Sequence, residues 1–71
     1  MLNSTMFTHA GQEYTAGIMP TFGAFRCKIY RGKTLLYERL VNQFEEFASP
    51  GLITRTLEQM IEDVCHGRHL G

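Results

Sequence analysis

The sequence predicts a small α+β domain, in which an antiparallel sheet of about three strands is followed by a short helix and a C-terminal amphipathic helix packed on one face. Three observations predict this class. Residues 24–31 alternate between apolar and polar side chains, and residues 52–66 carry apolar side chains at helical spacing. The chain has 71 residues, 44% of them hydrophobic and 20% charged, which suits one small globular core.

The N-terminal part of the chain divides into an arm and a first strand. Residues 1–12 show neither the strand period nor the helical period, so we expect a flexible arm there and a single domain over residues 13–71. Residues 13–19 alternate, with Tyr14, Ala16 and Ile18 on one side, and therefore predict a strand. We expect Pro20 to end this strand, since residues 20–23 have turn chemistry.

Residues 24–31 predict the next strand, with an apolar face that includes Cys27 and an opposite face that is mostly basic. A three-residue loop over residues 30–32 would put Gly32 in the left-handed conformation. That loop predicts a register in which Cys27 lies opposite Leu35 and Phe25 lies opposite Tyr37, so that both pairs share the buried face.

Residues 33–48 allow two interpretations. The preferred one is a strand over residues 33–39 and a helix of about two turns over residues 41–48, because the helical period fits from residue 40 onward. The alternative is one helix over residues 34–48, which would give a ββαα unit. The sequence Ser49-Pro50-Gly51 then breaks the chain.

The helix over residues 52–66 is the clearest element, and Gly67 is a natural residue to end it. Its apolar face, together with the apolar face of the hairpin, predicts the core. The predicted core residues are Phe25, Cys27, Ile29, Leu35, Leu57, Met60, Ile61 and Val64.

The sequence gives little support for an enzyme, a metal-binding protein or a membrane protein. No phosphate loop, nucleophile elbow or paired-carboxylate motif is present, and a domain of this size has little room for a complete active site. Cys65, His66 and His69 lack the second ligand pair that zinc usually requires, so we expect no metal, no cofactor and no enzyme activity. We also expect no signal peptide and no membrane span, and hence a cytoplasmic protein.

The two cysteines, Cys27 and Cys65, do not form a disulfide framework of the kind found in small secreted domains. Two free thiols in a reducing compartment are the first interpretation. A single bridge from strand to helix is the alternative.

The charges sum to zero but are segregated. Residues 26–39 hold five basic side chains against one acidic one, whereas residues 40–71 hold five acidic against two basic. Two faces are therefore candidates for a partner. The first is a basic strand face beside an aromatic turn, and the second is the acidic side of the last helix. The candidate residues are Phe22, Arg26, Lys28, Tyr30 and Lys33 on the first, and Glu58 and Glu62 on the second.

The apolar side chains give a further indication of a partner. Met19, Phe22, Phe44 and Phe47 exceed what so small a domain can readily cover, and exposed aromatic and methionine side chains favour a protein partner or a homodimer.

The layout of the C-terminal half resembles a known class of small phage proteins. The stretch Arg31-Gly32-Lys33 is followed by Ser49-Pro50-Gly51-Leu52 and then by Arg55, Glu58, Met60 and Glu62, a layout similar to that of type I-F anti-CRISPR proteins. This resemblance implies a non-enzymatic, phage-encoded inhibitor that binds a nucleic-acid-handling complex of the bacterial host and blocks it by occlusion. A small prophage or plasmid regulator that binds nucleic acid through the basic strand face is the alternative.

Overall fold

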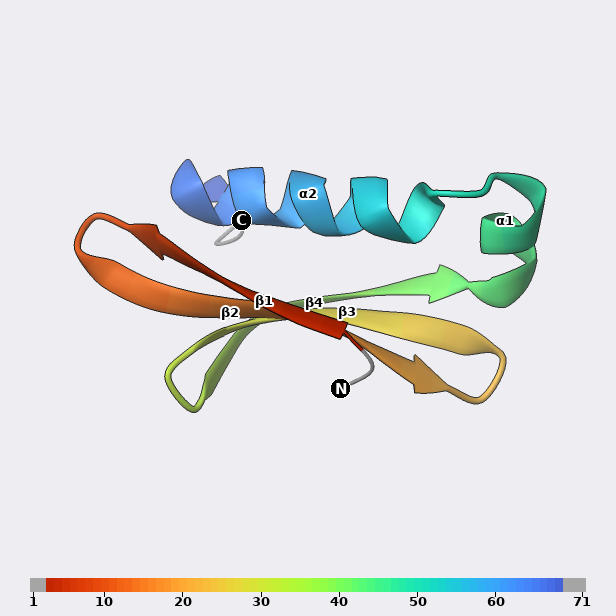
Figure 1. The fold of residues 1–71 in the computed structure, drawn as a ribbon, viewed down its shortest axis with the longest axis horizontal. Helices are drawn as coiled ribbons and strands as arrows, with labels where there is room; N and C mark the ends of the chain where they lie inside the picture. Colours follow the sequence, from red (N-terminus) through yellow and green to blue (C-terminus); the bar gives the residue numbers. More distant parts are fainter. Residues whose placement is uncertain (1–2, 69–71) are drawn as a thin grey trace.

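The computed structural model describes residues 3–68, which form a four-stranded antiparallel sheet followed by two helices (Figure 1). The elements are β1 (Asn3–His9), β2 (Gln12–Thr21), β3 (Ala24–Arg31), β4 (Thr34–Asn42), α1 (Gln43–Ala48) and α2 (Leu52–Cys65). Each strand pairs with its neighbour in the chain, so the sheet order is β1-β2-β3-β4. The predicted α+β class is confirmed, with four strands in place of three.

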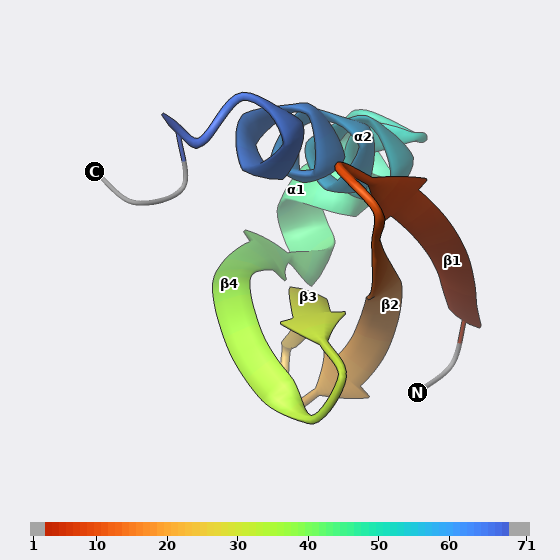
Figure 2. The same ribbon diagram turned by 90° about the vertical axis from the view of Figure 1, so that its left-hand side faces the viewer.

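The molecule has two layers. The long helix α2 lies across one face of the sheet, and no helix of the described chain covers the other face (Figures 1 and 2). The buried side chains come from β2, β3, β4 and α2 and lie between the layers. They are Tyr14, Ala16, Ile18, Cys27, Ile29, Val41, Ile53, Met60 and Val64.

The additional strand is β1, which occupies most of the segment expected to be an arm without regular structure. A two-residue turn joins it to β2, and both turn residues have positive φ, 53° at Ala10 and 77° at Gly11, as in a type I′ hairpin. Phe7 stacks on Tyr14 with ring centroids 5.1 Å apart. Between Ser4 and His9 only Phe7 is half-buried, and the others are exposed. The sequence of β1 therefore lacks the alternating apolar pattern from which a strand is predicted.

The second strand continues through Pro20, which was expected to end it. The reason lies in the direction of the missing N–H group. In the β2–β3 hairpin, the N–H position of residue 20 points away from β3. On that side the described pairing with β1 begins only at Ile18, so the proline breaks no described ladder bond.

The predicted register of β3 and β4 is wrong. The loop has two residues, Gly32 and Lys33, and Cys27 lies opposite Arg39 instead of Leu35. Phe25 likewise lies opposite Val41 instead of Tyr37.

A β-bulge explains part of the difference. Tyr37 pairs with Ile29 and Leu35 pairs with Tyr30, which leaves Leu36 as an extra residue in β4. The bulge lets Leu36 and Tyr37 both pack against the core. Leu35 is 45% exposed as a result, so its assignment to the core is wrong.

The segment after the hairpin is a strand followed by a helix, so the ββαα alternative is excluded. The strand continues to Asn42, beyond the predicted end at residue 39, and α1 begins at Gln43 instead of residue 41. Val41 is buried in the sheet, and the Asn42 side chain accepts a hydrogen bond from the Phe44 N–H at 2.7 Å. The helix therefore starts where an amide side chain caps it.

The last helix matches its prediction to within one residue. Of the predicted core, Cys27, Ile29, Met60 and Val64 are buried, whereas Phe25, Leu57 and Ile61 are half-buried at its margin. Gly51 offers no side chain to cap α2. Instead the Glu46 carboxylate accepts hydrogen bonds from three backbone N–H groups, those of Gly51 (3.1 Å), Leu52 (3.2 Å) and Ile53 (3.3 Å).

Candidate functional site

One end of the molecule carries a group of four phenylalanines, Phe22, Phe25, Phe44 and Phe47, which we call the aromatic end. Phe44 and Phe47 come from α1, which has only six residues and no buried side chain. They are 73% and 87% exposed, and Phe22 in the β2–β3 turn is fully exposed. Phe25, at the start of β3, is half-buried beside them. Large aromatic side chains exposed together are unusual on a monomeric domain.

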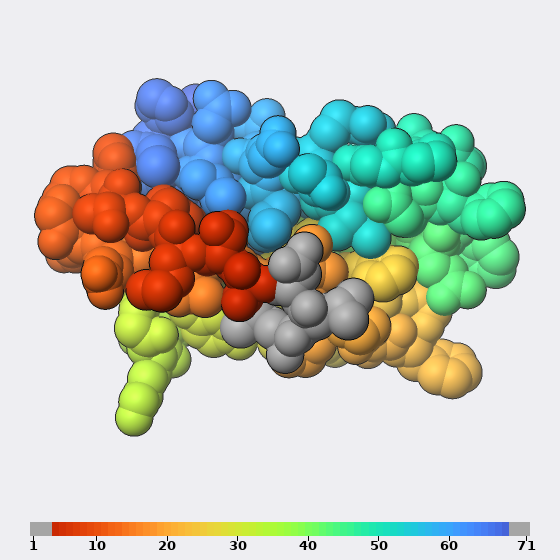
Figure 3. Space-filling model, viewed as in Figure 1, coloured from red at the N-terminus to blue at the C-terminus, as the bar shows by residue number. Residues whose placement is uncertain are grey.

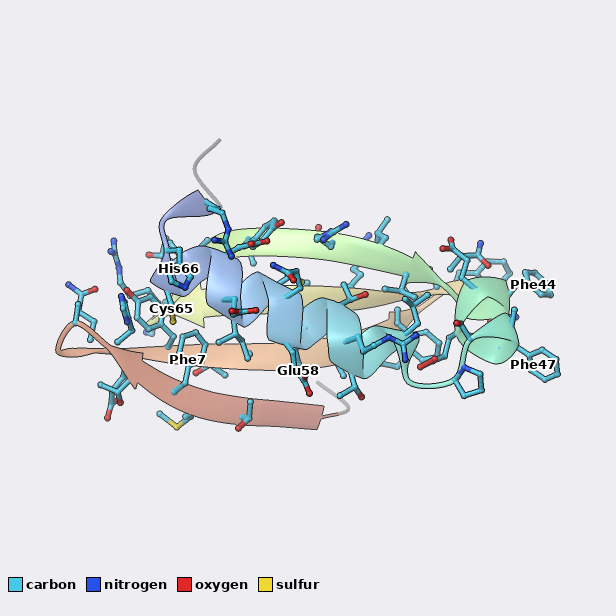
Figure 4. All side chains as sticks on the ribbon, turned by 90° about the horizontal axis from the view of Figure 1, so that it is seen from above. Phe7, Phe44, Phe47, Glu58, Cys65 and His66 are labelled. Atoms are coloured by element: carbon cyan, nitrogen blue, oxygen red, sulfur yellow. The ribbon has the colours of Figure 1, made fainter. Side chains whose placement is uncertain are left out.

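The hairpin turn and α1 meet at this end because a backbone hydrogen bond joins them. The N–H of Gln43 donates to the carbonyl oxygen of Gly23 at 3.1 Å. In Figure 3 the green α1 segment and the orange-to-yellow β2–β3 turn occupy the same end of the surface. Figure 4 shows the Phe44 and Phe47 side chains extending outward there, at the opposite end from Cys65 and His66.

A hollow of about 460 Å³ opens between these aromatic side chains. Phe25, Phe44 and Phe47 line it together with Gln43 and Glu46, so most of its wall is apolar. Such a hollow suits one or two apolar side chains of a partner, which aromatic walls bind by burial and ring contacts.

The wall of this hollow is held in place by the junction of the two helices. Glu46 lines the hollow and also caps α2 through its carboxylate. The Ser49 N–H donates to the Glu45 carbonyl oxygen at 2.9 Å, which closes the end of α1. The exposed aromatic side chains therefore belong to a helix whose position is fixed by hydrogen bonds, which lowers the entropy cost of binding a partner through them.

The predicted basic strand face exists, but a neighbouring carboxylate neutralises part of it. Arg26, Lys28 and Tyr30 lie on the uncovered side of β3, as predicted. The observed register places Glu38 directly opposite Lys28. The Glu38 carboxylate lies 3.6 Å from the Lys28 ammonium and 3.9 Å from the Arg26 guanidinium.

Tyr30 and Lys33 meet at the other end of the same strand. With Thr15 and Gly32 they line a shallow hollow of about 370 Å³ beside the β3–β4 turn. Phe22 lies in the β2–β3 turn at the opposite end of β3, so the structure does not bring it together with Lys33.

Glu58 and Glu62 are exposed on α2, and the Glu58 side chain extends from the helix on the side where β1 lies (Figure 4). The acidic and basic candidates therefore belong to different layers of the molecule and form two separate surfaces.

Both cysteines are free thiols, so the strand-to-helix bridge is not formed. Cys27 is fully buried in the core, where burial raises its thiol pKa and the nearby Arg39 offsets this only in part. A raised pKa keeps the thiol protonated and unreactive. Cys65 is half-buried at the end of α2.

The histidine and cysteine candidates for a metal form no cluster within residues 3–68, where no three potential ligands lie together. His69 lies outside the described residues. Asp63, which the sequence analysis did not single out, is instead held by the side chains of Tyr37, Gln59 and Arg68.

The fold and the site together define a small α+β protein, a four-stranded antiparallel meander under one long helix with an exposed aromatic end. Comparison of the chain with protein-family models, curated proteins and solved structures finds no match. Within the described residues, neither helix is long and apolar enough to span a membrane.

Proposed function

We propose that this protein is a non-catalytic protein-binding module that docks its partner through the aromatic end and acts by occluding the surface it covers. The observation that carries the proposal is the exposure of Phe44 and Phe47 on the wall of one apolar hollow, with the fully exposed Phe22 at the same end of the molecule. Burial of large apolar side chains drives association, and aromatic anchors at the centre of an interface supply most of its binding energy.

The chemistry of the aromatic end narrows the class of partner. The first turn of α1 carries Glu45 and Glu46 and its last turn carries no basic residue, so α1 contributes negative charge beside the hollow. A complementary partner presents a large apolar side chain flanked by lysine or arginine. The molecule is small, and one face offers about half of a standard interface area. Affinity therefore rests on a few anchors.

The resemblance to type I-F anti-CRISPR proteins supplies the first partner to assay. A nucleic-acid-handling complex of a bacterial host has basic surfaces that this acidic and aromatic end would complement. Occlusion of such a surface requires no catalytic group in the inhibitor, in keeping with the absence of a recognisable catalytic motif from the sequence.

The test is a binding measurement with a purified type I-F CRISPR complex, followed by capture from bacterial lysates. Replacement of both Phe44 and Phe47 by serine removes two exposed anchors, and we expect affinity to fall at least tenfold, since a hot-spot residue is worth about 2 kcal/mol or more. Both side chains are mostly exposed, so the melting temperature should change little.

Leu35→Ser provides the matched control, because Leu35 is also exposed but lies in β4, outside the aromatic end. This variant should retain full binding. Equal binding by the wild type and the Phe44/Phe47 double variant would contradict the proposal.

Binding of nucleic acid through the basic strand face is the second candidate, favoured by the hollow that Tyr30 and Lys33 line. Glu38 counts against it, because its carboxylate already pairs with Lys28 and Arg26. A phosphate-binding face would show an affinity that falls steeply with salt, and Lys33→Ala would reduce that slope by about one unit.

A further inference from the structure

The strand β1 is one edge of the sheet, and its outer side has no partner strand in the described chain. The sheet order places β1 and β4 at the two edges. Figure 4 shows them on opposite sides of the molecule, with α2 above the strands between them. An edge strand presents unpaired backbone N–H and C=O groups that can pair with another strand.

The register shows which backbone groups are available. The two-residue turn makes His9 and Gln12 the closing hydrogen-bonded pair of the hairpin. Since hydrogen-bonded and non-hydrogen-bonded pairs alternate, every second residue of β1 directs its backbone toward β2. The residues between them, Ser4, Met6 and Thr8, direct their N–H and C=O groups outward.

The two edges differ in how they are protected. Residues 3–8 contain no charged residue and no proline, and β1 has no bulge. At the other edge, β4 has a bulge at Leu36 and charged side chains at Glu38 and Arg39. Bulges and charges are the features that block strand addition in natural sheets. Only β1 is therefore open to it.

We infer that β1 pairs in antiparallel fashion with β1 of a second copy of this chain, which joins the two sheets into one. The available groups are spaced symmetrically about Met6, so a two-fold axis there pairs Met6 with Met6 of the second copy. The same axis pairs Ser4 with Thr8 of the second copy. No like charges meet at this axis, because the segment is neutral.

The side chains of β1 fit this pairing on both faces of the joined sheet. On the uncovered face the two Met6 side chains, each 65% exposed in the single chain, contact each other. On the helix face Thr5 lies opposite Phe7 of the second copy and covers the exposed part of that ring. The two-fold axis is perpendicular to the sheet, so both α2 helices lie on the same side of it. The two aromatic ends remain outside the interface.

The test is the mass of the full chain in solution as a function of concentration, by sedimentation or light scattering. The wild type should approach twice the 8.1 kDa chain mass as concentration rises to about 1 mM, because a single added strand is a small interface of modest affinity. Amide exchange at Ser4, Met6 and Thr8 should slow over the same range.

Met6→Lys places two like charges opposite each other at the axis and should weaken association at least tenfold without changing the melting temperature. Leu40→Lys is the matched control, because Leu40 is 62% exposed in β4, and it should dimerise as the wild type does. A monomer at every concentration would overturn the inference. So would a dimer that Met6→Lys leaves intact, or one that only the Phe44/Phe47 double serine variant abolishes.

Discussion

Asp63 is a carboxylate in α2 that joins the end of the helix to the sheet. One of its oxygens accepts hydrogen bonds from Arg68 at 3.0 Å and Gln59 at 3.1 Å, and the other accepts one from the Tyr37 hydroxyl of β4 at 3.5 Å. The Arg68 hydrogen bond is the largest cause that holds the pKa of Asp63 below its ordinary value of 3.8, followed by that of Gln59. Donors to a carboxylate favour its charged form.

The lowered pKa predicts a loss of stability in acid. A carboxyl group that titrates lower in the folded state stabilises the fold above its unfolded pKa, and that contribution disappears as pH falls through the folded value. The melting temperature of Asp63→Asn should therefore fall less steeply than that of the wild type as pH decreases below about 3.8. Thermal denaturation monitored by circular dichroism from neutral pH to pH 2 measures this.

Glu62→Gln is the control, because Glu62 is exposed on the same helix. It should retain the acid sensitivity of the wild type. Identical pH profiles for Asp63→Asn and the wild type would show that this carboxylate does not couple protonation to folding.

Among the elements, the junction of α1 and α2 is held by several hydrogen bonds, of which the Glu46 carboxylate accepts three. Helix N-termini leave backbone N–H groups without partners, and Glu46 satisfies three of them where Gly51 has no side chain to do so. Glu46→Ala should lower the free energy of unfolding by about 1–2 kcal/mol, as the loss of other N-caps does. Urea denaturation measures the change, and Glu45→Ala, in the same helix turn, should leave stability nearly unaltered. A smaller effect at Glu46 than at Glu45 would contradict this role.

The elements differ in how well their sequences predict them. The strand over residues 24–31 and the helix from residue 52 were predicted almost to the residue, because each carries a full apolar period. The strand β1 was missed, since it gains its place by pairing with β2 through a tight turn and buries little beyond part of Phe7. The register of β3 and β4 was missed mainly because the loop is Gly32-Lys33 instead of residues 30–32, and the bulge at Leu36 shifts the pairing by one further residue.

At the scale of the whole molecule, stability depends on a core with few fully buried side chains. Met60 is fully buried between α2 and the sheet, whereas Leu57 on the same helix is only half-buried. Met60→Ala should cost about 2–5 kcal/mol, out of a total of roughly 4–10 kcal/mol for a domain of this length. Leu57→Ala should cost less. Chemical denaturation of both variants measures the difference, with Glu58→Ala as the exposed control. Equal costs for Met60 and Leu57 would contradict the assignment of Met60 as the centre of the core.

The candidate site was only partly predictable from the sequence, because it depends on contacts between segments that are distant in the chain. The excess of phenylalanine over what the core can cover was visible in the sequence, and Phe22, Phe44 and Phe47 are exposed. Their gathering at one end depends on the hydrogen bond between Gln43 and Gly23, which joins two segments twenty residues apart. The neutralisation of Lys28 by Glu38 likewise depends on the register that the bulge and loop set.

The chain-order meander also has a consequence for how rapidly the protein acquires its fold. Every strand finds its partner across a two-residue turn, so the entropy of closing a long loop is not incurred in assembling the sheet. Pairing between neighbouring strands keeps many contacts local in sequence, and chains with more local contacts fold faster. The docking of α2 onto β2, β3 and β4 joins more distant parts of the sequence. We therefore expect the closure of the helix over the sheet to be the slower step of folding.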